Sequence, residues 1–359
     1  MSHVAEQLSK QDLPERVGKC LESLRWMVGD TPLFAIRVRV RGREFVVHAK
    51  YEISNFTGSI KDRMALHMIA EAYSCGRLKE GDTIAEATSG NTGISFSAMG
   101  RVLGHPVRIY MPDWMSMERV HLIRGLSASV IPVSNEQGGF LGSIAMADHE
   151  AELVTDVFRP HQFSSGANLA AHARSTGPEL VAQMAALDCA PSAFVAGVGT
   201  GGTVMGVGAH LKGVFGKKVT IHPLEPANSP TLREGKKVGK HRIQGISDEF
   251  IPELVNLHEL DPIVDVWDGD AILMAQSLSR VLGLGVGISS GANMLGAIKV
   301  ALQQGKSARV ATVFADSNKK YLSTDLCSDE EMKPKYLTHE VELLDFQVIP
   351  RSGAGFPVF

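Results

Sequence analysis

The segment Gly197–Thr203 (GVGTGGT) has the composition of an anion-binding loop. It follows the apolar run Ala193–Ala196 and precedes a helical pattern. Small residues let backbone N–H groups close on an anion, the two threonine hydroxyls add donors, and the helix dipole favours negative charge. The loop therefore predicts a phosphate site.

Two other interpretations of this loop stay open. Gly197, Gly199 and Gly202 fit the dinucleotide pattern G-x-G-x-x-G, with Glu225 as a ribose-binding acid, although Glu225 lies further along the chain than that pattern's usual spacing. A plain tight turn is the simplest alternative. Other motifs must decide between a phosphate, a nicotinamide cofactor and no ligand.

A second polar loop, Thr88–Gly93 (TSGNTG), also separates a strand pattern from a helix pattern. Hydroxyl and amide groups at a positive helix terminus suit the carboxylate of a small substrate. Helix capping by Ser89 or Asn91 alone is the alternative. Capping needs one polar residue, and this loop has several.

Lys61 ends a third loop and precedes a helical pattern. Positive dipole charge at a helix start lowers the pKa of an amine and favours the neutral form that attacks a carbonyl carbon. A solvated surface lysine is the ordinary alternative, and only the neighbouring loops favour chemistry.

These loops need strands and helices to hold them. Short apolar runs alternate with helical patterns, which predicts parallel sheets covered on both faces, an α/β class with two doubly wound units. A hairpin is expected over Phe34–Lys50, a helix over Arg63–Leu78, and a crossing between units over Asp156–Ser165. The strand candidates are Thr83–Ala87, Val107–Met111, Ser129–Val133, Ala193–Ala196, Val219–Leu224 and Val310–Phe314.

Composition excludes several classes of protein. The chain has 359 residues, 44% of them hydrophobic and 21% charged, which is typical of a globular protein of two domains. A net charge of −3 gives no reason to expect nucleic acid, and no apolar run reaches the ~20 residues of a membrane span. Four scattered cysteines predict reduced thiols in the cytoplasm. Neither they nor His149, His161 and His172 have metal-ligand spacing, so no metal is expected.

With all three loops in view, the chain resembles the pyridoxal-phosphate (PLP) enzymes of fold type II, the tryptophan synthase β-like group, in its cysteine synthase and cystathionine β-synthase family. The resemblance runs from Gly29-Asp30-Thr31-Pro32-Leu33 to Tyr321-Leu322-Ser323-Thr324, with the motifs in family order. Met111-Pro112 to Glu118-Arg119 and Thr176–Glu179 match structural signatures.

The resemblance implies a role for each motif. Lys61 would be the Schiff-base lysine and Ser289 the partner of the pyridine nitrogen. Thr88, Ser89, Gly90, Asn91 and Thr92 would bind the substrate carboxylate, with Asn91 also meeting the ring hydroxyl of the cofactor. Gln162 and Gly245 would line the substrate site, and the phosphate cup would be Gly199, Thr200, Gly201, Gly202 and Thr203.

The resemblance also implies the layout: PLP in the cleft between the two domains, and a homodimer. Residues 1–20 would form an N-terminal arm, and 21–54 with 166–327 a larger phosphate-binding domain. Residues 55–165 would form a smaller mobile domain carrying Lys61. Beyond the resemblance, residues 328–359 are acidic at first and then apolar, which predicts a tail that could dock on the body or on a partner subunit.

Two departures from the family concern specificity. Asp248 and Glu249 stand where cysteine synthases have small residues, and Glu249 matches an acid of cystathionine β-synthases. These acids could hold the ammonium of a second amino acid, act on a thiol or water, or be solvated. Asp316 replaces a usual serine; it could compete with Ser289 for the ring nitrogen or lie on the surface.

The expected function is β-replacement or β-elimination on a serine- or cysteine-derived amino acid through an aminoacrylate. A neutral serine at the ring nitrogen favours this chemistry. Cysteine synthesis from O-acetylserine and sulfide is the leading activity. Alternatives are cysteine desulfhydration with release of sulfide, and synthesis of cystathionine, lanthionine or 2,3-diaminopropionate. A nicotinamide dehydrogenase and a non-catalytic PLP-binding homologue are the remote alternatives.

Overall fold

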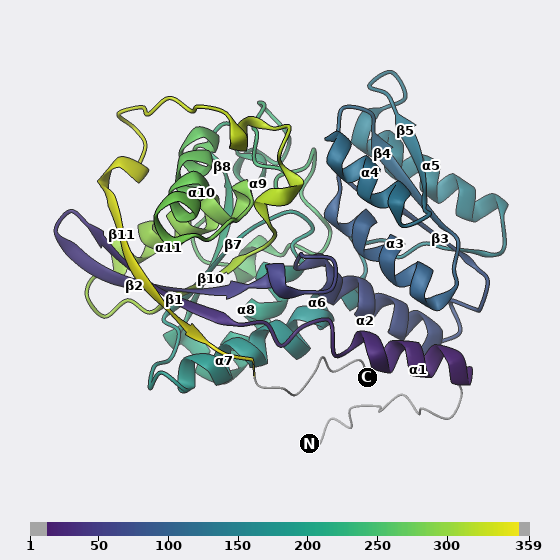
Figure 1. The fold of residues 1–359 in the computed structure, drawn as a ribbon, viewed down its shortest axis with the longest axis horizontal. Coiled ribbons are helices and arrows are strands. Elements are labelled where there is room, and N and C mark those ends of the chain that lie inside the picture. Colours follow the sequence, from purple (N-terminus) through teal and green to yellow (C-terminus); the bar gives the residue numbers. More distant parts are fainter. Residues whose placement is uncertain (1–12, 352–359) are drawn as a thin grey trace.

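A computed structural model describes residues 13–351, and shows two α/β halves side by side (Figure 1). A seven-stranded sheet has the order β11-β1-β2-β10-β7-β8-β9, and a four-stranded sheet has the order β5-β4-β3-β6. The strands are β1 (Leu33–Val40), β2 (Arg43–Tyr51), β3 (Thr83–Ala87), β4 (Val107–Pro112), β5 (Ser129–Val133), β6 (Val157–Phe158), β7 (Ala193–Gly197), β8 (Thr220–Pro226), β9 (Val264–Val266), β10 (Val310–Phe314) and β11 (Val341–Ile349).

Helices cover both faces of both sheets (Figure 1). The α-helices are α1 (Glu15–Leu24), α2 (Lys61–Ser74), α3 (Asn91–Leu103), α4 (Met117–Gly125), α5 (Gly139–Leu153), α6 (Gly166–Ala171), α7 (Gly177–Ala185), α8 (Gly202–Phe215), α9 (Thr231–Glu234), α10 (Asp268–Leu282) and α11 (Ile288–Gln304). No described helix combines the length and apolarity needed to cross a membrane.

The seven-stranded sheet combines a parallel centre with an antiparallel edge. Strands β2, β10, β7, β8 and β9 run parallel, while β1 is antiparallel to both β2 and β11. Arg41 and Gly42 turn the hairpin with φ of 50° and 74°, as a two-residue turn between twisted strands requires. Helices α10 and α11 pack on one face and α7 and α8 on the other.

Ion pairs on the outer strand follow the register of the β1–β11 ladder. Arg37 bonds Asp345, Arg39 bonds Glu342 and Arg41 bonds Glu340, each across the edge of the sheet. These pairs are exposed and add little stability individually. The register of the ladder shifts between Arg37 and Val38, so the partners of Arg37 and Arg39 lie three residues apart on β11.

The four-stranded sheet is wholly parallel. Its core includes Met64 and Ile69 of α2 and Phe96 of α3, and α1 joins the same core through Val17 and Leu21. Helix α5 covers the opposite face through Ala147, which packs with residues of β3, β4 and β5.

A buried cluster of charges links the first turn of α2 to β2 and α7. Arg63 bonds Glu52 at 2.6 Å and Glu179 at 2.6 Å, and Lys50 bonds Glu179 at 2.7 Å. Arg63, Glu52 and Lys50 are inaccessible to solvent. We call Lys50, Glu52, Arg63 and Glu179 the buried ion cluster.

The predicted fold class, two doubly wound units with parallel-rich sheets, is confirmed. All six predicted strands exist, as does the hairpin. The helix predicted to extend to Leu78 ends at Ser74 instead, because the chain turns at Gly76 with φ of 73°. Strands β6, β9 and β11 were not predicted: β6 and β9 are short, and β11 lies in the tail.

Residues 1–12 and 352–359 lie outside the described residues, and with them most of the predicted arm and the end of the tail. Two parts of these segments are described. Arm residues from Glu15 onward form α1, and tail residues Val341–Ile349 form β11 on the body of the same chain. The domain boundaries stay a prediction.

Candidate active site

A cavity lies between the two halves, at the carboxyl ends of their strands. The starts of four helices border it: α2 with Lys61, α3 with Asn91, α8 behind Thr200, and α11 with Ser289. Open α/β folds place ligands at this edge, where helix N-termini carry partial positive charge. The site residues predicted from sequence that line the cavity are Lys61, Thr88, Ser89, Asn91, Thr92, Gln162, Gly199, Thr200, Thr203, Gly245, Asp248 and Ser289.

Lys61 is the first residue of α2 and presents its side chain to the cavity. Removal from water lowers the pKa of the amine, and the carboxylates of Asp248 and Asp316 oppose that shift. Among the described residues, no acceptor lies within hydrogen-bond distance of Nζ. The amine is therefore available to a ligand.

The glycines of the loop Gly199–Thr203 pack so closely against neighbouring residues that a Cβ would collide with them. A Cβ on Gly199 would lie 2.4 Å from the carbonyl oxygen of Gly245, and one on Gly202 would lie 2.0 Å from Asn168 Oδ1. Gly201 has φ of 84°, which favours glycine. Gly201 and Gly202 lie behind the cavity wall and shape the loop.

Two side chains support this loop from behind. Asn168 donates from Nδ2 to Thr200 Oγ1 at 2.9 Å and to the carbonyl oxygen of Gln162 at 2.8 Å. His172 Nε2 lies 3.3 Å from Thr203 Oγ1. Burial holds the pKa of His172 well below its ordinary value, with the charges of Arg63 and Lys61 adding to the effect. A neutral imidazole can thus orient the Thr203 hydroxyl.

The loop Thr88–Gly93 is fixed by its own hydroxyls. Thr88 Oγ1 accepts from the N–H of Gly90 at 3.0 Å, and Thr92 Oγ1 donates to Gln162 Oε1 at 2.7 Å. Gln162 in turn donates to the carbonyl oxygen of Ala87 at 2.7 Å. Gly90, within this loop, packs against Arg119, because a Cβ on Gly90 would lie 2.2 Å from Arg119 Cδ.

Ser289 lies in the first turn of α11, and its hydroxyl makes no hydrogen bond to any described residue. Its side chain lines the cavity although the residue is buried. An unpaired hydroxyl at a helix start is available to accept from or donate to a bound group.

The two acids differ in placement. Asp248 lines the cavity, and removal from water raises the pKa of its carboxyl to about 6, with Lys61 opposing the shift. Glu249 does not line this cavity; its Oε1 lies 3.4 Å from Lys237 Nζ. Of the two, Asp248 alone lines the cavity that holds Lys61, whereas Glu249 lines an adjoining cavity that shares Ser89, Gly245 and Asp248 with it.

Several lining residues were not predicted as site residues. Arg119 belongs to a stretch interpreted as a structural signature, and Phe163 and Ile246 stand inside the motifs of Gln162 and Gly245 without a predicted role of their own. Phe140, Gln244 and Asn293 were not part of any motif. Asn293 accepts from the N–H of Gly197 at 2.8 Å and donates to the carbonyl oxygen of Val313 at 2.8 Å. Tertiary packing brings these last three residues to the cavity, so the sequence carried no local signal for them.

Glu225 is not a ribose-binding acid. It lies away from the cavity, inaccessible to solvent, and its Oε2 accepts from the N–H of Leu232 at 2.7 Å. Within residues 13–351, no group of three or more histidine, cysteine, aspartate or glutamate side chains is arranged to hold a metal ion.

Comparison with known proteins identifies the family. Residues 25–316 match the family described as pyridoxal-phosphate dependent enzyme. The chain belongs to this family. It is therefore an enzyme that uses PLP, and the dehydrogenase alternative is wrong.

Individual relatives agree. A probable cysteine synthase of Bacillus subtilis (strain 168) is 39% identical over 302 residues, covering 84% of this chain and 96% of the relative. A solved structure of a hydrogen sulfide-producing enzyme from Fusobacterium nucleatum is 52% identical, with a TM-score of 0.90 over 92% of this chain and 99% of that one. A cysteine synthase structure from Entamoeba histolytica is 30% identical, with a TM-score of 0.78 over 94% and 97% of the two chains.

The cavity fits the cofactor. Gly199, Thr200 and Thr203 line the cavity at the start of α8, where backbone N–H groups favour a phosphate, and the unpaired amine of Lys61 and hydroxyl of Ser289 border the same space. The amine could bond the carbonyl carbon of PLP, and the hydroxyl could hydrogen-bond its ring nitrogen.

Proposed function

We propose that the enzyme exchanges or releases a sulfur substituent at Cβ of a cysteine- or serine-derived amino acid. The observation that carries this proposal is the pairing of an available amine, Lys61, with a carboxyl of raised pKa, Asp248, in one cavity lined by two anion-binding loops. The names of the relatives, cysteine synthase and hydrogen sulfide-producing enzyme, support the same class of reaction.

The residues divide the work. Gly199–Thr203 would hold the cofactor phosphate, Ser289 its ring nitrogen, and Thr88–Thr92 with Gln162 the substrate carboxylate. Lys61 would bind the cofactor's carbonyl carbon and, once displaced by substrate, take the proton from Cα. Bound PLP supplies the electron sink for charge developing at that carbon. Because the hydroxyl of Ser289 is neutral, it would not keep the ring nitrogen protonated, which would limit the electron sink and favour loss of a Cβ substituent.

Asp248 supports release of sulfide from cysteine as the favoured direction. Once the Cβ–S bond has broken and hydrosulfide has left, its carboxylate can take a proton from water as the water oxygen bonds Cβ. Return of a proton to Cα from Lys61 completes serine, so cysteine and water give serine and hydrogen sulfide. An incoming hydrosulfide anion would instead meet a negative charge. The second candidate is cysteine synthesis from O-acetylserine and sulfide, which the curated relatives favour.

The test compares both directions on one preparation of holoenzyme. With L-cysteine, sulfide, serine and pyruvate are measured; with O-acetyl-L-serine and sulfide, cysteine and acetate are measured. The proposal expects sulfide and serine from cysteine at a higher kcat/KM than cysteine formation. Cysteine formation alone would establish the second candidate. No turnover in either direction would overturn the proposal.

The substrate is an amino acid, as in the rest of the family. We propose in addition a homodimer in the cytoplasm, on the strength of the family resemblance. Sedimentation of the purified holoenzyme and fractionation of cells test these two statements independently of the reaction.

A further inference from the structure

The carboxamide of Asn91 is held from both ends by charged groups. Its Nδ2 donates to Asp316 Oδ2 at 2.7 Å, and its Oδ1 accepts from Lys320 Nζ at 2.8 Å. Asn91 also lines the cavity. A carboxylate only accepts hydrogen bonds and an ammonium only donates them. The two contacts therefore determine which end of the amide is the nitrogen and which is the oxygen.

The charged partners are buried and fixed in turn. Asp316 is inaccessible to solvent, and its Oδ2 also accepts from the hydroxyl of Tyr321 at 2.8 Å. Lys320 is 5% exposed and lies 3.4 Å from the carbonyl oxygen of Gly58. The sequence left two placements open for Asp316, on the surface or at the ring nitrogen. The surface placement is wrong, because the side chain is buried.

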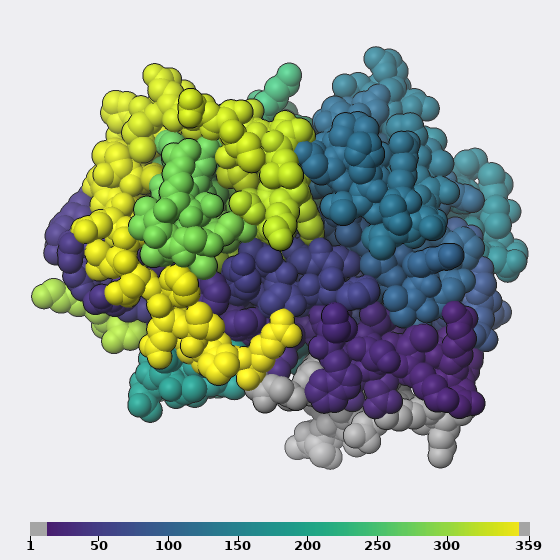
Figure 2. Space-filling view, viewed as in Figure 1, coloured from purple at the N-terminus to yellow at the C-terminus, as the bar shows by residue number. Residues whose placement is uncertain are grey.

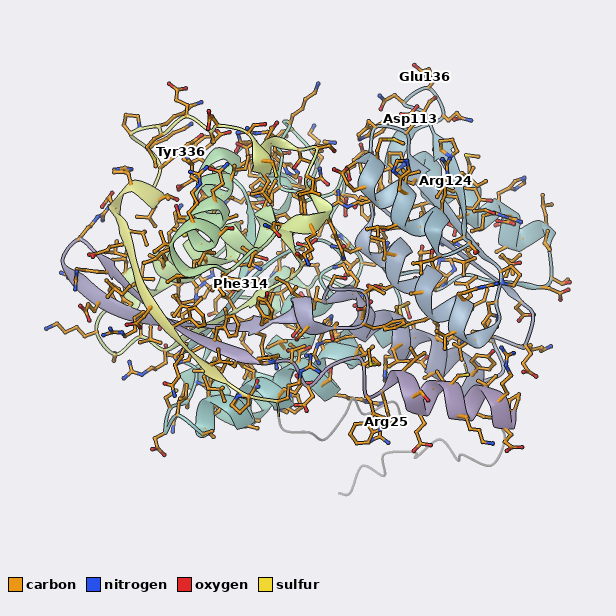
Figure 3. All side chains as sticks on the ribbon, viewed as in Figure 1. Arg25, Asp113, Arg124, Glu136, Phe314 and Tyr336 are labelled. Atoms are coloured by element: carbon orange, nitrogen blue, oxygen red, sulfur yellow. The ribbon has the colours of Figure 1, made fainter. Side chains whose placement is uncertain are left out.

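The contacts cross between the two halves of the molecule. Asn91 begins α3, beside the four-stranded sheet, whereas Asp316 and Lys320 follow β10 of the seven-stranded sheet. Figure 3 labels Phe314, the last residue of β10, from which the chain runs on to Asp316. Two residues beyond Tyr321, Ser323 donates to Glu118 of α4, where the yellow-green and blue segments meet in Figure 2.

We propose that Asp316 and Lys320 are positioning residues that lock the Asn91 carboxamide in one orientation, with its second N–H directed to the cofactor. We call this pair the amide clamp. An amide has two N–H groups, and one is used by Asp316, so one is left for the cavity. The reverse orientation would set the amide N–H groups against an ammonium and its oxygen against a carboxylate.

The clamp explains why an acid stands at position 316. A serine there could not reject the reversed amide, because a hydroxyl both donates and accepts. An aspartate can only accept, so it makes the orientation one-sided. The inference rests on the proposed function only in placing the cofactor in this cavity; it does not depend on which sulfur reaction follows.

The test measures the cofactor itself. Holoenzymes carrying Asp316→Asn or Lys320→Met are dialysed against falling concentrations of PLP, and the retained cofactor and its visible absorption spectrum are recorded. Loss of one charge-assisted hydrogen bond predicts about a tenfold weaker PLP affinity and an altered ratio of the visible bands. Lys320→Met acts on the other end of the amide, so it tests the clamp even if Asp316→Asn fails to fold.

A double-mutant cycle separates positioning from general stability. In an Asn91→Ala background, Asp316→Asn should change the PLP affinity by less than about twofold, because the clamp has nothing left to orient. Asp270→Asn is the matched control: Asp270 is a buried aspartate that accepts from the N–H groups of Leu337 and Thr338, away from the cavity. It should leave the affinity and the spectrum unchanged.

Three outcomes would overturn the clamp. The first is an unchanged spectrum and affinity in both single variants. The second is an Asp316→Asn effect that persists undiminished without Asn91. The third is an equal effect of Asp270→Asn. If wild-type holoenzyme shows a normal spectrum but acts on neither cysteine nor O-acetylserine, the proposed function fails while the clamp is still tested.

Discussion

Lys50 and Lys61 are both removed from bulk water and both have a lowered pKa, yet their surroundings differ. Lys50 gives Nζ to three acceptors: the carbonyl oxygen of Thr31 at 2.6 Å, Glu179 at 2.7 Å and Gln183 at 2.9 Å. Lys61 has no such partner among the described residues. An ammonium has three protons to donate, so Lys50 is saturated and Lys61 is not.

The contrast extends to the surroundings of each lysine. In the buried ion cluster every charge faces an opposite charge, which holds the start of α2 against the seven-stranded sheet. In the cavity, by contrast, Lys61 and Ser289 lack partners. Saturated polar groups fix a structure, and unsaturated ones in a cavity are left for a ligand. The same residue type therefore serves two purposes: Lys50 fixes the fold, and Lys61 is left for a ligand.

The largest effect is expected from Lys61→Ala. Removal of the amine takes away both cofactor attachment and the proton carrier, so turnover should fall at least about 10³-fold. The visible band of the attached cofactor should disappear. Lys50→Met is the matched control, and it should keep that band while unfolding at lower temperature. A variant at Lys61 that kept both the band and turnover would erase the contrast between the two lysines.

Glu179→Gln should cost the most stability. It leaves Lys50 and Arg63 without a full counter-charge in a buried place, which costs about 3 kcal/mol of the free energy of unfolding. Urea unfolding at neutral pH measures this difference.

The same variant makes a pH prediction. The cations Arg63 and Lys50 hold the pKa of Glu179 below its ordinary value of 4.5, against the effect of burial. A lowered carboxyl pKa gives stability that is full above the ordinary value and is lost as pH falls further. The difference in free energy of unfolding between wild type and Glu179→Gln should therefore become smaller below about pH 4.5. A constant gap would mean that the charge of Glu179 does not matter.

Asp248→Asn should reduce release of sulfide by about 100-fold, the lower range for loss of a general base. In wild type, kcat/KM should rise as pH rises through about 6, because the base acts when ionised and the pKa of Asp248 is raised to about 6. Asp248→Asn should not show this rise of kcat/KM with pH. A rate that instead falls through pH 6 would assign Asp248 the role of an acid.

Glu249→Gln should have the smallest effect, less than about twofold on kcat/KM, since the side chain pairs with Lys237 outside the cavity. It serves as the neighbouring control for Asp248→Asn. Equal losses in the two variants would show that the loop as a whole, and not one carboxyl, sets the rate.

The parts of the site predictable from sequence were those with local motifs. Lys61, Thr88–Thr92 and Gly199–Thr203 each belong to a loop between a strand and a helix, and all three loops meet at the cavity. The sequence could not show which of Asp248 and Glu249 lines the cavity of Lys61. Adjacent side chains of a loop point in different directions, and only the fold determines which of them enters a cavity. Asp316 shows the same limit, since its partner Asn91 belongs to the other half of the molecule.

The fold was predictable where strands were continuous and apolar. The predicted strand Val310–Phe314 has the same bounds as β10. Such strands read as continuous apolar runs because central parallel strands are covered on both faces. β11 was missed because its side chains alternate less regularly and several are exposed. Its place depends on β1, which lies almost the whole chain away in sequence, so no local pattern announces it.

The pairing of β11 with β1 bears on how the protein is made. The four-stranded sheet draws its strands from one continuous stretch, Thr83 to Phe158, and can assemble while the ribosome is still at work. The seven-stranded sheet cannot be finished until Val341–Ile349 has emerged, and until then the outer edge of β1 stays open to other chains. A nascent chain that stalls late should therefore be the form most prone to aggregation.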